Sequence, residues 1–269
     1  MTFEFEQRKP IKGYPELHWT GKRPYTSTQY YPAQLKEVYG DPKDGWMNKI
    51  FWGDNLQVMS HMLKEYRGKI DLIYIDPPFA SGADYKKKIE FKKKKAFSET
   101  SVFEEKQYGD IWNNDEYLQF MYERIVLMKE LLSDTGSIFV HCDYRVSAYL
   151  RLILDEVMGK DNFKNEIIWH YSDGTAPQGA FKRKTDTIYF YTKTNNSVFN
   201  EIRVPSLNPK RYNKVDENGD YYFEDGHHGS AKRFYLKDGI ICDNVWTYVT
   251  DDGFRQLNSQ SDLRKKYGY

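Results

Sequence analysis

The sequence predicts an α/β protein with a parallel sheet, and three stretches of the chain carry this expectation. Residues 70–75 are mostly apolar and β-favouring, and an acid, two prolines and a phenylalanine follow at 76–79. This pattern is typical of a buried strand that ends at the prolines. Residues 116–132 carry apolar side chains at helical spacing, and residues 137–141 form a second apolar strand before another amphipathic helix at 146–158. Strands and helices that alternate in this order favour parallel βαβ units.

Shorter elements are predicted on either side of this unit. Residues 48–54 have the pattern of a short strand that ends in a turn, and residues 56–63 then carry apolar side chains at helical spacing. Gly136 is expected to mark the C-terminal end of the helix that precedes it. Residues 166–171 and 186–191 have the pattern of two strands joined by a polar loop, so we expect a β-hairpin there.

Length and composition divide the chain into three parts. Its 269 residues are enough for one α/β domain with an insertion. Residues 1–46 are rich in Pro, Gly, Tyr and charge, which predicts an arm that wraps a surface or stays partly loose. Residues 47–194 contain the strands and helices described above, and residues 195–269 predict a loop-rich β region that returns to the core.

The overall charge does not indicate a nucleic-acid partner, because 40 Lys and Arg residues stand against 39 Asp and Glu residues. A local cluster of lysines nevertheless follows the two prolines. It is the best candidate for contact with phosphates, although a solvated loop explains it equally well. The cluster consists of Lys86, Lys87, Lys88, Lys92, Lys93, Lys94 and Lys95.

Cysteine and histidine usage argues against disulfides and metals. The two cysteines, Cys142 and Cys242, are far apart and in no metal-like spacing, so a reducing, cytoplasmic setting is expected. His227 and His228 have no third ligand at a suitable spacing, so we expect no metal. No apolar stretch is long enough to span a membrane, and the first residues are acidic, unlike a signal sequence.

The acid at the end of the first strand is the main candidate for chemistry. Open α/β sheets bind ligands at the carboxyl ends of their strands, where Asp76 is expected. The Asp76 carboxylate and the Pro77 carbonyl can each accept an N–H from an exocyclic amine of a nucleobase, while Phe79 stacks on the ring. The amine nitrogen then directs its lone pair at an electrophile, and the base must first leave the duplex. The alternative is that this Asp-Pro-Pro sequence is an ordinary turn.

Four stretches of the chain together resemble a known family. The tetrapeptide at 76–79 looks like the catalytic motif of amino-methyltransferases, which methylate adenine N6 or cytosine N4 in DNA. Residues 53–55, 115–159 and 165–171 extend the similarity to the β-class enzymes, particularly the modification subunits of type III restriction systems. The resemblance implies a partial Rossmann-like methyltransferase sheet with helices on both faces, plus a loop-rich β insertion for target recognition.

The resemblance also assigns roles to individual residues. It implies that Asp76, Pro77, Pro78 and Phe79 form the catalytic motif and that the cofactor is S-adenosylmethionine. It implies that Asp54 binds this cofactor, whereas the local pattern equally predicts a helix N-cap, and the two roles are compatible. An acid in the first motif position, rather than serine, favours adenine N6 over cytosine N4.

Two positions near the predicted site are given no catalytic role. His141 and Asp143 stand at the end of the second strand and face the same cleft as Asp76 in this arrangement, but methyl transfer to an amine needs no strong base beforehand. Family members often have histidine before the acid that corresponds to Asp186; here Thr185 stands there, which puts a role in holding the base in doubt.

The predicted function is site-specific adenine-N6 DNA methylation in a restriction-modification system, with double-stranded DNA as substrate. The loop-rich stretch at 195–237 resembles a target-recognition region, or is a solvent-facing β appendage. The glycine-rich turn that receives the cofactor's methionine portion in β-class enzymes is not found. Three explanations are open: a truncated enzyme, a split enzyme whose second polypeptide brings the missing part, or an incomplete sequence. In each case turnover is expected to need the missing segment, and a restriction subunit is a further candidate partner. The alternative is a catalytically inactive DNA-binding or regulatory protein.

Overall fold

The computed structural model divides into two compact units, one containing Met1–Ser197 and the other Val198–Trp246. The residues that the structure describes are 1–6, 15–78, 84–89, 103–109, 114–171, 177–206, 208–225 and 232–247.

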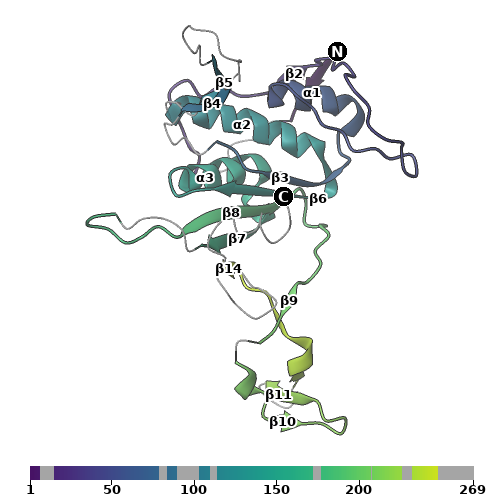
Figure 1. The fold of residues 1–269 in the computed structure, drawn as a ribbon, viewed down its shortest axis with the longest axis vertical. Coiled ribbons are helices and arrows are strands. Elements are labelled where there is room, and N and C mark those ends of the chain that lie inside the picture. The colour runs from purple at the N-terminus through teal and green to yellow at the C-terminus, as the bar shows by residue number, and fades with distance from the viewer. Residues whose placement is uncertain are drawn as a thin grey trace, which may run out of the picture. The chain divides into compact units, whose positions relative to one another are not determined.

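The first unit is built on a mixed β-sheet (Figure 1). Strand β3 (Ile70–Ile75) pairs in parallel with β6 (Leu132–Cys142), which confirms the predicted parallel pairing. Strand β8 (Thr185–Thr192) runs antiparallel to both β6 and β7 (Phe163–His170), so the predicted hairpin is confirmed as well. The order β7-β8-β6-β3 leaves β3 at one edge of the sheet among the described strands.

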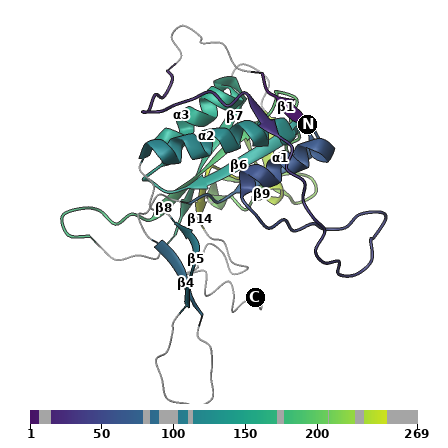
Figure 2. The same ribbon diagram turned by 90° about the horizontal axis from the view of Figure 1, so that it is seen from above.

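Three helices lie against one face of this sheet (Figures 1 and 2). They are α1 (Asn55–Tyr66), α2 (Asn114–Leu131) and α3 (Ser147–Met158), close to the predicted helical segments. Their apolar side chains form one core with alternate residues of β6, of which Ile138 and Val140 are fully buried. The α/β class is therefore confirmed. Helices are expected on both faces of the sheet, but in the described part of the chain they cover only one.

The opposite face of the sheet is only partly covered. Successive side chains of a strand point to opposite faces, so Phe139 of β6 lies on this second face. Its ring stacks on Phe190 with centroids 4.5 Å apart, within a small apolar cluster that also includes Ile188. Leu72 and Tyr74 of β3 are 62% and 56% exposed. The end of β3 is thus accessible from the side away from the helices.

The predicted helix end at Gly136 is wrong. Helix α2 ends at Leu131, and β6 begins at the next residue, so Gly136 lies inside the strand. The pairing of β3 with β6 shifts register here, because Ile70 pairs with Leu132 and Leu72 with Ser137. A Cβ on Gly136 would lie 2.8 Å from the Ile70 carbonyl oxygen. The glycine is therefore required by a close backbone approach and not by a helix terminus.

The predicted strand at residues 48–52 is also absent, since these residues have no regular structure. Ile50 and Trp52 are 98% and 92% exposed, so no sheet position buries them. Short apolar runs predict burial and not the type of element, which explains the error.

The N-terminal arm packs onto the helices of the first unit. Strand β1 (Thr2–Glu4) pairs antiparallel with β2 (Ser27–Gln29), and Phe3 and Phe5 join the main core. Side chains of the arm thus contribute to the core of the first unit.

The lysine cluster begins in a strand. Strand β4 (Asp84–Ile89) contains Lys86, Lys87 and Lys88 and pairs antiparallel with β5 (Phe103–Gly109). The other four lysines lie outside the described residues.

The second unit consists of short strands and turns. A three-stranded antiparallel sheet is formed by β10 (Lys214–Val215), β11 (Tyr221–Asp225) and β12 (Lys232–Tyr235). A two-stranded ladder pairs β9 (Arg203–Val204) with β13 (Ile240–Ile241). Among the described residues, the remaining elements are the 3-10 turn Lys160–Asn162 of the first unit, the 3-10 turns Pro209–Arg211 and Leu236–Asp238 of the second unit, and strand β14 (Val245–Thr247).

The asymmetry between the two sheet faces leads to a stability prediction. Replacing the fully buried Leu150 of α3 by alanine should lower the free energy of unfolding by about 2–5 kcal/mol, because a cavity opens in the helix-side core. Replacing Leu72 on the open face should cost less than about 1 kcal/mol. Urea titration monitored by circular dichroism measures both values, and equal losses would mean that Leu72 is covered in solution.

Candidate active site

Asp76 follows directly after β3, at the strand end where the sequence predicts it. The strand ends at Ile75, and two half-buried prolines follow the acid. The Asp76 side chain is 57% exposed. Phe79, the aromatic member of the predicted motif, lies outside the described residues. The structure therefore gives an accessible carboxylate at the carboxyl end of a strand, followed by two residues that cannot extend the ladder.

A histidine joins Asp76 to a second acid. The Nδ1 atom of His141 lies 3.2 Å from Oδ1 of Asp76, and its Nε2 atom lies 3.4 Å from Oδ2 of Asp186. The side chains of His141 and Asp186 are 8% and 17% exposed, so both are far less accessible than Asp76. Three neighbouring strands thus contribute one side chain each to a row of two carboxylates with an imidazole between them.

The strand register explains why these three side chains meet. Ile75 pairs with Val140 in the parallel ladder, so the next residue of each strand, Asp76 and His141, are neighbours. Strand β8 runs antiparallel to β6, which brings its first residues, including Asp186, to the same end of the sheet. His141 shares the open face with Phe139, because the two residues are two positions apart along the strand.

Two aromatic residues line the row. The Trp169 ring is 5.5 Å from the His141 ring, and the Tyr171 hydroxyl donates to Oδ1 of Asp186 across 3.4 Å. Burial and the charge of Asp186 raise the pKa of Tyr171, so its hydroxyl stays protonated and remains a donor. Asp186 is therefore approached by Tyr171 from one side and His141 from the other.

The environment favours the protonated form of His141. Burial by itself lowers the pKa of an imidazole, but the contact with Asp186 and the charges of Asp76 and Asp186 outweigh this effect. The pKa of His141 is consequently raised above its ordinary value. Both ring nitrogens are donors in the imidazolium, which suits a position between two acceptors.

Asp143 has a structural role at the entry to α3. Its carboxylate accepts from the Arg145 backbone N–H at 2.9 Å and pairs with the Arg145 guanidinium at 2.9 Å. Its backbone carbonyl accepts from the N–H of Ser147, the first residue of the helix. Of the two polar residues at the end of the second predicted strand, His141 is the one that lies against the motif acid.

Asp54 is the N-cap of α1, as the local pattern predicts. Its Oδ1 atom accepts from the backbone N–H groups of Leu56 and Gln57, at 3.0 and 3.2 Å. Its Oδ2 atom accepts from the guanidinium of Arg124 at 3.2 Å, and this guanidinium lies 3.4 Å from the centre of the Phe120 ring. The Asp54 side chain is 51% exposed, so one part of the carboxylate still faces solvent.

The remaining candidates from the sequence lie away from this row or outside the described residues. In the ladder of β4 with β5, Lys87 is opposite Glu105 and Lys88 is opposite Glu104. His227 and His228 lie outside the described residues. The described residues contain no cluster of three or more potential metal ligands.

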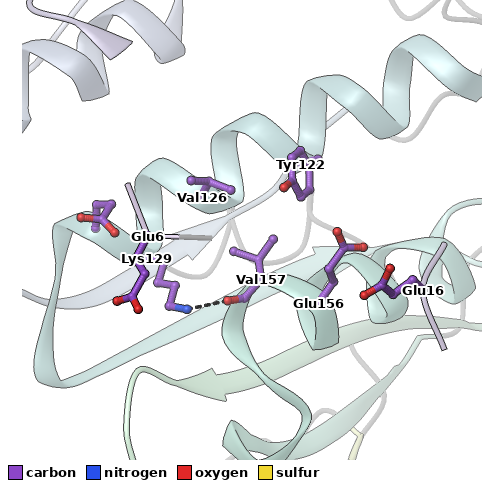
Figure 3. Close-up of a pocket in the computed structure, with 8 residues that line it drawn as sticks. Glu6, Glu16, Tyr122, Val126, Lys129, Glu156 and Val157 are labelled. Atoms are coloured by element: carbon purple, nitrogen blue, oxygen red, sulfur yellow. Dashed lines mark hydrogen bonds between the residues drawn. The ribbon is translucent and has the colours of Figure 1, made fainter. Parts of the chain in front are cut away.

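A small hollow on the helix side has a different character (Figure 3). Its volume is about 60 Å³, which holds roughly two waters and no nucleobase. It is lined by residues of α2, α3 and the arm, and Lys129 donates to the Val157 carbonyl oxygen across it at 2.7 Å. It shares no residue with the row around His141, so it is not the candidate site.

Among the residues that the structure describes, none of the helices combines the length and the hydrophobicity needed to span a membrane.

Comparison with known structures finds similarity to DNA methyltransferases at low identity. The M1.HpyAVI complex with SAM is 16% identical with a TM-score of 0.36, and covers 60% of this chain and 63% of that one. The cytosine-N4-specific PvuII DNA methyltransferase is 14% identical with a TM-score of 0.33, and covers 59% of each chain.

Curated relatives come from restriction-modification systems. The probable Mod subunit of the type III enzyme HindVI from Haemophilus influenzae is 30% identical over 271 residues, which cover 88% of this chain and 34% of the relative. The type II methyltransferase M.EcaI from Enterobacter cloacae is 30% identical over 178 residues, which cover 65% of this chain and 36% of the relative. The chain thus spans about a third of the length of these relatives.

The family model described as DNA methylase matches residues 70–267, well over half of the chain. The match begins with β3 and includes the acid, the histidine and the second acid of the row. The chain therefore belongs to the N6/N4 DNA methylase family.

Proposed function

We propose that this chain carries the catalytic and target-recognition parts of an S-adenosylmethionine-dependent DNA methyltransferase that acts on the exocyclic amine of adenine. The observation that carries the proposal is the position of Asp76. Its accessible carboxylate follows β3, an edge strand among the described strands, and lies toward the open face, while His141 contacts it from the protein side.

The proposed chemistry uses acceptors and needs no strong base. The Asp76 carboxylate and the Pro77 carbonyl each accept one N–H of the amine, which frees the nitrogen lone pair for attack. Positive charge then develops on nitrogen beside a fixed negative carboxylate, which stabilises the transition state. Phe79 stacks on the extruded base and fixes its plane.

The sequence motif supports adenine over cytosine. An acid occupies its first position, at Asp76, and the resemblance associates an acid there with adenine N6. The relatives' names do not separate the two bases, because the family includes N6 and N4 enzymes. Whether the target base is adenine or cytosine is therefore determined by identifying the methylated product.

Asp54 can hold part of the cofactor while it caps α1. A carboxylate has about four acceptor positions, and three of those on Asp54 are used by Leu56, Gln57 and Arg124. One position remains on an exposed group, which fits a hydroxyl or ammonium group of S-adenosylmethionine. Arg124 and Phe120 also line an open groove of about 510 Å³. When bound, the cofactor supplies an electrophilic methyl group.

The side chains of the second unit are better suited to contacts with bases than to the binding of phosphates. Its cations stack on aromatic rings, with Arg211 3.9 Å from the centre of Phe223 and Arg233 4.9 Å from that of Tyr222. Acids pair with the same cations, as Asp225 does with Arg211 at 3.0 Å. Because these charges are neutralised within the unit, we assign it target recognition by hydrogen bonds and stacking.

The proposed setting is a cytoplasmic restriction-modification system with double-stranded DNA as substrate. The relatives named above include a Mod subunit of a type III enzyme, which makes a restriction subunit the expected partner. A second polypeptide that contributes to the cofactor site also stays a candidate partner. The sequence contains only two cysteines, far apart, which supports a reducing compartment. The alternative function is DNA binding or regulation without catalysis.

The two functions are separated by a product assay. The chain is incubated with duplex DNA and S-adenosylmethionine labelled on its methyl group, and the digested DNA is analysed for methylated nucleosides. We expect label in N6-methyladenine once the polypeptide that completes the cofactor site is added. Label in N4-methylcytosine would show that cytosine is the target base. DNA binding without label in the completed enzyme would favour the non-catalytic alternative.

Substitution of the motif acid tests its role. Asp76→Ala should lower the rate of methyl transfer roughly 30- to 1000-fold, or about 2–4 kcal/mol, because the transition state then lacks one acceptor. Asp71→Ala is the matched control, since it removes a carboxylate from the opposite end of β3, where Asp71 accepts from Ser133. Single-turnover rates measure both changes, and an unchanged rate for Asp76→Ala would refute the assignment.

The lysine cluster is tested by the salt dependence of DNA binding. Replacing Lys86, Lys87, Lys88 and the four lysines at 92–95 by glutamine should flatten the plot of log K against log salt, by about 0.9 for each phosphate that is no longer neutralised. Replacing Lys36 and Lys160, exposed lysines elsewhere in the chain, serves as control. An unchanged slope for the cluster variant would show that it does not touch phosphate.

A further inference from the structure

His141 has no role in the chemistry proposed above, yet it is placed where it can control that chemistry. Each of its ring nitrogens lies next to a different carboxylate, at 3.2 Å from Asp76 and 3.4 Å from Asp186. Its side chain is 8% exposed and its ring contacts Trp169, so the imidazole has little freedom to move away.

The protonation state of His141 decides how firmly Asp76 is held. The imidazolium donates from both nitrogens and can contact both carboxylates together. The neutral ring has one donor and one lone pair, so one of the two carboxylates then faces a lone pair and is repelled. Asp186 is nearly buried and is also contacted by Tyr171, whereas Asp76 is exposed. Asp76 is therefore the acid that separates more easily from the ring.

We propose that His141 is a positioning residue that, in its protonated form, holds the Asp76 carboxylate in the orientation needed for methyl transfer. The proposal rests on the proposed function of Asp76. Contact through Oδ1 of Asp76 leaves Oδ2 to accept from the amine of the base, since each carboxylate oxygen has its own lone pairs. Asp186 fixes the orientation of the His141 ring, and the ring in turn fixes the orientation of the exposed Asp76 carboxylate.

The charged groups around the ring determine the sign of the pH dependence. Asp76 and Asp186 are the carboxylates in contact with it, Tyr171 contacts Asp186, and Asp143 at the same strand end is paired with Arg145. The two contacting acids raise the pKa of His141 against the effect of burial. Stabilisation by this row is therefore fully present below the ordinary imidazole pKa of about 6.5 and is lost as the pH rises through the raised pKa.

The first test follows the His141 ring directly and needs no catalysis. Long-range proton–nitrogen NMR spectra of the ¹⁵N-labelled chain are recorded against pH, with His141 assigned by its absence in His141→Gln. We expect a midpoint above the ordinary value, which Asp76→Asn and Asp186→Asn each move to lower pH. Asp134→Asn is the control, because this acid is 85% exposed at the other end of β6 and its charge should not affect the ring.

The second test links this titration to methyl transfer. His141→Phe keeps an aromatic ring beside Trp169 but has no donor, and should lower the rate about 10- to 100-fold, as is typical when the partner that orients a site ligand is removed. His141→Gln retains one neutral donor and should keep more of the rate than the phenylalanine variant. The wild-type rate should fall as the pH rises through the NMR midpoint, and this fall should be missing in His141→Gln.

The outcomes separate this inference from the function on which it rests. An unshifted His141 midpoint in Asp76→Asn, or wild-type rates and pH profiles in both His141 variants, would overturn the positioning role. A shifted midpoint together with no methylation by the wild-type chain, even with the polypeptide that completes the cofactor site, would leave the coupling in place and refute the catalytic function instead. Unfolding free energies of the His141 variants, measured at each pH, show whether a lower rate reflects a loss of fold.

Discussion

The parallel pairing of β3 with β6 is the constraint on which the candidate site depends. The ladder sets Ile75 opposite Val140, and the next residue of each strand then places a carboxylate beside an imidazole. A register slip of one residue would turn His141 to the helix side of the sheet. The close backbone approach at Gly136, toward the other end of the ladder, and the buried Ile138 in its middle hold this register, because neither tolerates displacement.

The distribution of burial between the two faces explains how the same sheet can be stable and still open to a substrate. The helix side contains almost all of the fully buried apolar side chains, so the free energy of folding comes mainly from that side. The open side needs only the small cluster around Phe139 and Phe190 to support His141 and Trp169. An exposed acid is tolerated there because solvent reaches it.

Elements with a regular spacing of apolar side chains can be predicted from the sequence, whereas features that depend on contacts between distant residues cannot. Helices α1, α2 and α3 and the hairpin of β7 with β8 follow from apolar spacing alone. The prediction for Gly136 fails because its neighbour, the Ile70 carbonyl, is supplied by another strand. The strand prediction around Ile50 fails because an apolar run alone does not show which neighbouring element, if any, would cover it. In the structure Ile50 is exposed.

The same distinction applies to the site. Asp76 is predictable because prolines end its strand locally, whereas the role of His141 depends on three strands that are far apart in the sequence. A signal is present, since His141 and Asp186 each stand near the end of a strand. Its meaning depends on the antiparallel placement of β8, which brings the second carboxylate to the other nitrogen. A histidine beside one acid is an ordinary ion pair. His141 lies between two acids of unequal exposure, so its protonation state determines how strongly it holds both of them. Asp76 is the more exposed of the two and is the one that a substrate would contact.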